Sequence, residues 1–140
     1  MLREIAGVRQ DQAELRRRWF QDDYLDLFVW LDRSGELRAF QLAYDRSGDE
    51  HLLEWEHARG YLHRRVVDDR GTFRGVGGTP LLTIGKRFPK YRVMVEFAAR
   101  SATVDEMLRN LVRQRIAAYT PRRPRHPFAL RRGSHRAHRL

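Results

Sequence analysis

Three histidines recur at intervals of six residues, and their type and spacing suggest chemistry. His51, His57 and His63 lie close to the carboxylates of Glu54 and Glu56. Imidazole and carboxylate groups are the ligands with which proteins bind zinc and related metals. The spacing matches no HExxH or comparable metal-binding motif. The histidines therefore indicate a metal site only if the fold brings their rings together.

The second feature that could support chemistry is a carboxylate among aromatic residues. Asp26 lies in a segment that also contains Tyr24, Phe28 and Trp30. A carboxyl group that aromatic neighbours desolvate has a raised pKa and can act as an acid, a base or a ligand-orienting group. Alternatively, an arginine or the Tyr44 hydroxyl satisfies this carboxylate in a purely structural role. The sequence leaves both interpretations open.

Glycine-rich and serine-containing segments offer no clear catalytic motif. Residues 75–78 (GVGG) lack both the Lys-Ser/Thr ending of a P-loop and a helix after it, and they do not form a dinucleotide-binding fingerprint. Ser34 and Ser47 fall in expected hairpin turns, which are poor positions for a nucleophile. We therefore expect a flexible connection at residues 70–79 and assign no catalytic residue.

The positive charge of the chain is concentrated at its C-terminus. The 140 residues have a net charge of +10. Residues 121–140 contain seven arginines and no acidic residue, which leaves 21 basic and 18 acidic residues, or +3, for the rest. Such a segment is typical of a basic tail that neutralises phosphates without recognising base sequence. The tail arginines are Arg122, Arg123, Arg125, Arg131, Arg132, Arg136 and Arg139.

A weak, non-specific nucleic-acid partner is accordingly one expectation for the tail. Two features weaken the expectation of a nucleic-acid partner. Lys86 and Lys90 are the only lysines, and so high a share of arginine is typical of GC-rich, bacterial-type genomes. Moreover, no RRM, KH or zinc motif accompanies the charge.

Composition excludes several classes of site. The chain has no cysteine, which excludes disulfides, thiolate metal sites and cysteine nucleophiles and fits a reducing cytoplasm. The longest strongly apolar run, Leu27–Leu31, is far too short to span a bilayer, and residues 1–10 contain no signal-peptide core. We expect a cytoplasmic protein with no cofactor, no metal and no membrane partner.

Evenly spaced turn residues predict the elements that position these groups. Residues 32–35 and 45–48 share the sequence DRSG, and further turns follow at residues 59–60 and 68–71. Short runs rich in aromatic and β-branched residues separate them, as in an antiparallel β-meander. The strands are predicted at residues 16–20, 24–31, 37–44, 50–57, 61–67 and 80–84, with a further segment at 2–9 that fits a strand.

Two C-terminal segments are candidates for helices. Residues 89–100 fit either a strand or a helix, and we favour the helix because Pro89 suits a helix N-terminus. Residues 104–119 show an apolar helical face behind a predicted Thr103–Glu106 capping box. The fold class is therefore α+β: an antiparallel β-meander of about five to seven strands, strongly curved or half-barrel-like, packed by one or two C-terminal helices. Residues 1–120 form the single domain, and residues 121–140 form the tail.

The turns also predict a register between strands. If Gly35 takes the left-handed position of a three-residue loop, Phe28 faces Phe40, Tyr24 faces Tyr44 and Asp26 faces Leu42. The same geometry at Gly48 places Ala39 opposite Trp55, and a two-residue turn at 59–60 places Glu56 opposite His63. Side chains alternate along a strand, so His51 and His57 then lie on the core side and His63 on the other side. This register argues against a metal site.

This register gathers one aromatic face with a carboxylate in it. Its members are the candidate ligand or interface residues Tyr24, Asp26, Phe28, Trp30, Phe40 and Tyr44. Another part of the chain covers such a face, or a second copy pairs with it, or a ligand binds it. We therefore expect a small binding or assembly module without catalysis of its own, with a homodimer through this face as one form. The alternatives are a nucleic-acid-associated protein that uses its tail, and a small-molecule or enzymatic site around Asp26.

Overall fold

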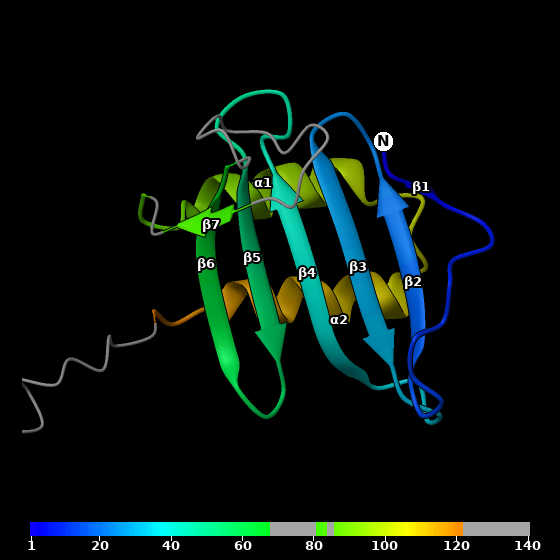
Figure 1. Ribbon diagram of the computed structural model, residues 1–140. Helices are drawn as coiled ribbons and strands as arrows, with labels where there is room; N and C mark the ends of the chain where they lie inside the picture. The colour runs from blue at the N-terminus through cyan, green and yellow to red at the C-terminus, as the bar shows by residue number, and fades with distance from the viewer. Residues whose placement is uncertain (68–80, 84–85, 122–140) are drawn as a thin grey trace, which may run out of the picture.

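The computed structural model describes residues 1–67, 81–83 and 86–121. Within these ranges, seven strands form one antiparallel sheet in the order of the sequence (Figure 1). They are β1 (Arg3–Glu4), β2 (Arg16–Gln21), β3 (Leu25–Leu31), β4 (Leu37–Tyr44), β5 (His51–Glu56), β6 (Gly60–Val67) and β7 (Leu81–Thr83). The predicted antiparallel meander is confirmed, and the sheet is open rather than closed. The predicted Gly-rich connection at 70–79 and all but the first residue of the predicted tail at 121–140 lie outside the described residues.

Two helices, α1 (Lys90–Arg100) and α2 (Glu106–Ala117), lie across the same face of the sheet (Figure 1). In α1, Val93 and Phe97 are four residues apart and both are buried. In α2, Leu108, Val112 and Ile116 form a buried stripe with the same spacing. This spacing places the apolar side chains on one side of each helix. The predicted helices at 89–100 and 104–119 are therefore confirmed, and the molecule has two layers.

The predicted capping box at the start of α2 is wrong. Among the described residues no side chain caps this helix, whose N-cap residue is Asp105. The Thr103 hydroxyl instead donates a hydrogen bond to the carbonyl oxygen of Leu2, whose side chain is buried. The backbone N–H of Leu2 in turn donates to the Arg100 carbonyl oxygen over 2.9 Å. Thr103 therefore ties the helical layer to the N-terminal segment rather than closing its own helix.

A β-bulge corrects the predicted register between β3 and β4. Gly35 has φ +86° and the turn closes as predicted, with Leu31 opposite Leu37. The register then shifts between Trp30 and Leu31, so that Trp30 pairs with Ala39 and Arg38 is the extra residue. One extra residue reverses which side chains of a strand face the core. The prediction that Phe28 faces Phe40 is therefore wrong.

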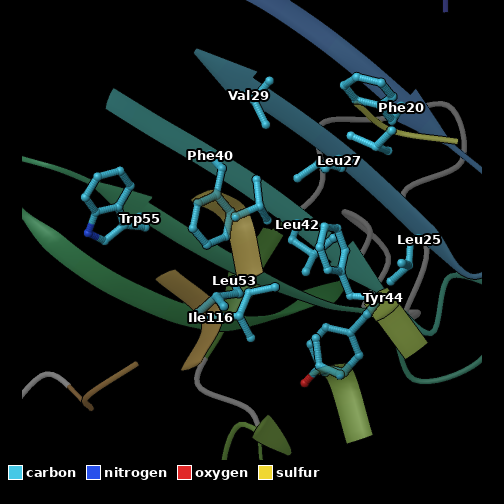
Figure 2. Packing of buried hydrophobic residues seen from close by; sticks show 14 of the residues in the cluster. Phe20, Leu25, Leu27, Val29, Phe40, Leu42, Tyr44, Leu53, Trp55 and Ile116 are labelled. Carbon is cyan, nitrogen blue, oxygen red and sulfur yellow. The ribbon is translucent and has the colours of Figure 1, made fainter. Parts of the chain in front are cut away.

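The bulge turns the aromatic residues of β4 into the core. Phe40, Leu42 and Tyr44 are fully buried among residues of β3, β5 and α2 (Figure 2). Phe40 and Tyr44, expected on the aromatic face, consequently lie on the opposite side of the sheet. Burial of each such side chain contributes about 1.5–3 kcal/mol, so the register is strongly determined.

The β4–β5 and β5–β6 pairs also differ from the predicted register. Phe40 rather than Ala39 pairs with Trp55, a second one-residue slip that cancels the first. Leu53 and Trp55 therefore face the core as predicted. The β5–β6 hairpin has a longer turn than predicted. As a result, His63 pairs with the buried Leu53 rather than with Glu56. His63 thus faces the core, which corrects its predicted position on the other side.

Candidate binding site on the outer face of the sheet

One face of the sheet is covered by α1 and α2, and we call the opposite one the outer face (Figure 1). Alternation along each strand decides which side chains it carries. From β2 to β6 these are Arg17, Trp19, Gln21, Asp26, Phe28, Trp30, Ala39, Gln41, Ala43, Leu52, Glu54, Glu56, Leu62 and Arg64. The face is mixed in chemistry, with aromatic residues concentrated on β2 and β3.

Three aromatic side chains form a continuous row on β2 and β3. The rings of Trp19 and Phe28 stack with centroids 5.1 Å apart, and Phe28 lies 6.2 Å from Trp30. The guanidinium of Arg17 lies 5.4 Å from the Phe28 centroid. Phe28 and Trp30 were predicted for this face, whereas Trp19 was missed. The alternation of β2 would have revealed it, since Trp19 pairs directly with Phe28.

The carboxylate of Asp26 is held by neighbours on the same face. The indole N–H of Trp19 donates to Asp26 Oδ1, and the side-chain amide of Gln21 approaches the same oxygen at 3.4 Å. Asp26 is half-buried. The expected partners, an arginine or Tyr44, are therefore replaced by an indole and an amide. The arrangement fixes the orientation of both Asp26 and Trp19.

Tyr24 occupies a different environment from the aromatic row. It precedes β3 and packs against the core, with the guanidinium groups of Arg92 and Arg100 at 5.7 and 4.8 Å from its ring. Burial raises the pKa of the Tyr24 hydroxyl above its usual value. Of the six predicted residues, the outer face brings together only Asp26, Phe28 and Trp30.

A groove of about 770 Å³ lies on the outer face at the end nearest the β5–β6 hairpin. Trp30, Glu54, Glu56 and Arg64 line it from the sheet, and residues 12–15 and 57–61 line its sides. Ala39 in its lining contributes only a methyl group, which leaves space between the longer side chains of β3 and β5. Grooves of this size accommodate small-molecule ligands.

Two buried N–H donors lie on β2 and β3, and the residue that carries one of them, Trp30, lines the groove. Trp30 Nε1 and Arg17 Nε are buried, and neither donates to an acceptor among the described residues. The two residues pair directly across β2 and β3. A buried donor without an acceptor costs about 1–3 kcal/mol.

Carboxylates dominate the β5 side of the groove. Glu54 and Glu56 alternate on the same face of β5, and Glu54 Oε1 accepts a hydrogen bond of 3.2 Å from the amide of Gln41. Glu56 lies 3.8 Å from the Nε of Arg59, and both side chains are at least half exposed. An ion pair this exposed is weak. The groove therefore carries both charges, since Arg38, Arg59 and Arg64 line it together with these carboxylates.

The histidines form a second polar group, buried between the sheet and Phe88. His51 and His63 stack with centroids 5.2 Å apart, and the Tyr44 hydroxyl lies 2.8 Å from His63 Nε2. His51 Nδ1 donates to the Asp49 carbonyl oxygen over 2.9 Å. We call Tyr44, His51 and His63 the histidine cluster. The predicted separation of His51 from His63 is thus wrong.

The histidine cluster has the geometry of a packed hydrogen-bond network. Its rings are nearly parallel, with 16° between His51 and His63, so their nitrogens lie in separate planes. His57 is remote from both and hydrogen-bonds to Arg38 at 2.8 Å. Within the described ranges, no three metal-ligating side chains converge. Burial and the neighbouring His51 lower the pKa of His63 to about 4, and burial raises that of Tyr44.

Comparisons with protein-family models, curated proteins and solved structures found no match for this chain. Over the part of the chain that the structure describes, neither helix is long and apolar enough to cross a membrane. The function is therefore argued from the outer face itself.

Proposed function

We propose that this protein is a small binding module whose ligand occupies the groove on the outer face. The observation that carries the proposal is the Trp30 side chain, which lines the groove and whose buried indole N–H has no acceptor among the described residues. A few convergent polar groups in a largely preformed hollow are typical of ligand sites. The proposal assigns recognition to this face and no chemical step.

The scaffold supports this role. Trp30, Ala39 and Glu56 lie on adjacent strands of a continuous sheet, whose other face is fixed by the core under α1 and α2. Side chains on such a scaffold lose little conformational freedom when a ligand binds. The hydrogen bond between Gln41 and Glu54 orients two further polar groups that line the groove.

Pairing of two copies through the same face is the second candidate. The aromatic row of Trp19, Phe28 and Trp30 is flanked by Arg17 on one side and Asp26 on the other. A face that carries both charges around an apolar centre is complementary to itself under two-fold symmetry. In that arrangement the outer face is an assembly surface rather than a ligand site.

Thermal denaturation in the presence of a library of small polar compounds tests the first proposal. Trp30→Phe removes the indole N–H and keeps an aromatic ring, whereas Tyr91→Ala alters an exposed side chain on α1 in the other layer. We expect compounds that raise the Tm of the unmodified protein and of Tyr91→Ala, with a much smaller shift for Trp30→Phe. Equal shifts in all three proteins would contradict binding at the groove.

Light scattering coupled to size exclusion separates the two candidates. The ligand-binding proposal predicts a monomer at micromolar concentrations. A dimer that Phe28→Ala converts to a folded monomer would instead establish the pairing of two copies. Circular dichroism of the variant shows whether the fold is retained.

A further inference from the structure

The groove on the outer face has acidic and basic side chains in equal number. Among the described residues that line it, the charged ones are Glu14, Glu54, Glu56, Arg38, Arg59 and Arg64. Their formal charges cancel. A ligand with a net charge would be attracted by one set of these side chains and repelled by the other. The lining therefore favours a neutral ligand.

Two of the basic side chains have partners near the β5–β6 turn. Arg59 lies 3.8 Å from Glu56, and both side chains are at least half exposed. Arg38 hydrogen-bonds to His57 at 2.8 Å, and both of these residues line the groove. Positive and negative groups therefore lie next to each other, so the groove has no separate cationic and anionic ends for a zwitterion to match.

Arg64 is the third basic side chain of the groove, and its guanidinium has no partner. It is half-buried and forms no hydrogen bond, ion pair or ring contact with the described residues. Its diagonal neighbour on β5 is Glu54, with Cβ atoms about 7 Å apart. Glu54 accepts a hydrogen bond of 3.2 Å at one carboxylate oxygen from the amide of Gln41. Guanidinium donors and a carboxylate acceptor thus lie at a separation that two neighbouring hydroxyl groups can bridge.

Trp30 gives the β3 side of the groove a flat apolar surface. The side chain is half-buried, and within the described ranges its only ring neighbour is Phe28, tilted by 32° with centroids 6.2 Å apart. Ala39, which pairs with Trp30 on β4, contributes only a methyl group. Gln41 and Glu54 pair with each other in the next row of the same face. A ring with one apolar face and a polar edge can therefore lie against Trp30 and Ala39 with its edge toward the polar row.

We infer that the groove binds a short neutral saccharide. The apolar face of one pyranose ring stacks on Trp30, and hydroxyl groups of the next ring bond to Glu54 and Arg64. Each hydroxyl both donates and accepts, so it pairs with a carboxylate, an amide and a guanidinium alike. Strand spacing and rise place Trp30 and Glu54 about 12 Å apart, a span for two linked rings. The inference rests on the proposed function, since it names the ligand class of the same groove.

Nuclear magnetic resonance of the isotope-labelled protein tests the inference with cellobiose, maltose and lactose as probes. At least one of these neutral disaccharides should shift the backbone amide signals of Ala39 and Gly60, which line the groove, saturably. The amide of Tyr91, on α1 in the other layer, should stay in place. Because the ligand carries no charge, its affinity should change by less than about twofold between low and high salt. Tighter binding of adenosine, a flat ring without a second sugar, than of every disaccharide would overturn the inference.

Paired variants assign the two contacts of the saccharide. Arg64→Gln should weaken the disaccharide about tenfold and leave the Tm unchanged, because the guanidinium has no partner within the described protein to lose. Arg113→Gln removes the same charge from an exposed position on α2 and should keep the affinity. Trp30→Leu should weaken binding at least about tenfold, whereas Trp19→Leu, outside the groove lining, should not. Circular dichroism shows that each variant is folded.

The result also separates this inference from the proposed function. Unchanged disaccharide affinity in folded Arg64→Gln and Trp30→Leu would place the saccharide elsewhere and overturn the inference. If no disaccharide shifts the groove amides, while a library compound raises the Tm of the unmodified protein and not of Trp30→Phe, the ligand class is wrong and the groove still binds. If no compound of either kind binds, both the inference and the proposed function fail.

Discussion

At the scale of single residues, His63 links the buried histidine cluster to pH. The Tyr44 hydroxyl, His51 and Lys86 face it, and the carboxylate of Asp49 lies within 3.8 Å of His51 and Lys86. Desolvation and the neighbouring His51 lower the pKa of His63 to about 4, against 6.5 for the free side chain. As the pH falls below about 6.5, the unfolded chain takes up a proton before the folded one.

Stability should therefore decrease as the pH falls from about 6.5 to about 4. The pKa difference sets an upper limit of about 3 kcal/mol on the contribution of His63 to this loss, and solvent screening of the partly exposed ring makes the contribution smaller. Urea unfolding at several pH values should show a smaller loss for His63→Gln. His57→Gln, which changes a histidine outside the cluster, should retain it. The same acid dependence in His63→Gln as in the unmodified protein would refute this assignment.

Asp22 is the residue that joins the sheet to α1. Its side chain is only 4% exposed and accepts hydrogen bonds from the backbone N–H groups of Tyr24 and Leu25 and from the Arg100 guanidinium. Burial alone would raise the pKa of Asp22, but these donors hold it below its usual value. The Asp22 carboxylate is thus ionised, and its two oxygens accept hydrogen bonds from both the sheet and α1.

Asp22→Ala should lower the free energy of unfolding by about 3 kcal/mol, because it leaves buried donors and a guanidinium without their partner. Asp23 provides a matched control, since it contacts the same Arg100 at 2.9 Å but is 87% exposed. Asp23→Ala should cost less than about 1 kcal/mol. Equal losses measured by chemical denaturation would show that Asp22 does not hold this junction.

At the scale of elements, the bulge at Arg38 decides which face of β4 is apolar. The Gly35 turn sets Leu31 opposite Leu37, and without an extra residue this register would continue to place Phe28 opposite Phe40. The bulge shifts pairing by one residue and turns Phe40 inward. A single inserted residue therefore separates the predicted aromatic face from the observed outer face.

Deletion of Arg38 should consequently abolish stable folding. The shortened β4 would either expose Phe40, Leu42 and Tyr44 or lose its pairing with β3. Arg38→Ala keeps the residue count and loses only exposed contacts with Asp32, Glu36 and His57, so it should cost about 1 kcal/mol or less. Dispersed amide spectra from the deletion variant, with Phe40 still buried, would contradict this account.

Strand β4, with its bulge at Arg38, shows which features could be predicted from the sequence and which could not. Strands, turns and both helices follow from local patterns, such as the repeated DRSG turns and the buried spacing of Val93 and Phe97. Register does not, because nothing in the residues around Arg38 distinguishes a bulge from regular pairing. Asp26, Phe28 and Trp30 were found for the outer face since β3 kept its predicted orientation. The unsatisfied donors of Arg17 and Trp30 were beyond prediction, because they depend on the packing of neighbouring side chains.

At the scale of the whole molecule, the packing contacts of the described domain come from residues that precede the arginine-rich segment. Tyr119 is near the end of the described chain, and its ring contacts Phe88 and Tyr61 with centroids 4.7 and 5.4 Å apart. Arg115 in α2 lies over Trp55 at 4.3 Å. The core and the outer face therefore both depend on residues before position 121.

A chain that ends at residue 120 should retain the Tm of the full chain within a few degrees, because no described core contact is removed. The truncation also tests the nucleic-acid alternative. If residues 121–140 bind nucleic acid, the full chain should retard DNA at low salt, and a salt increase should weaken it steeply through counterion release. The truncated chain should show no retardation. Retardation that survives the truncation would place nucleic-acid binding on the domain itself.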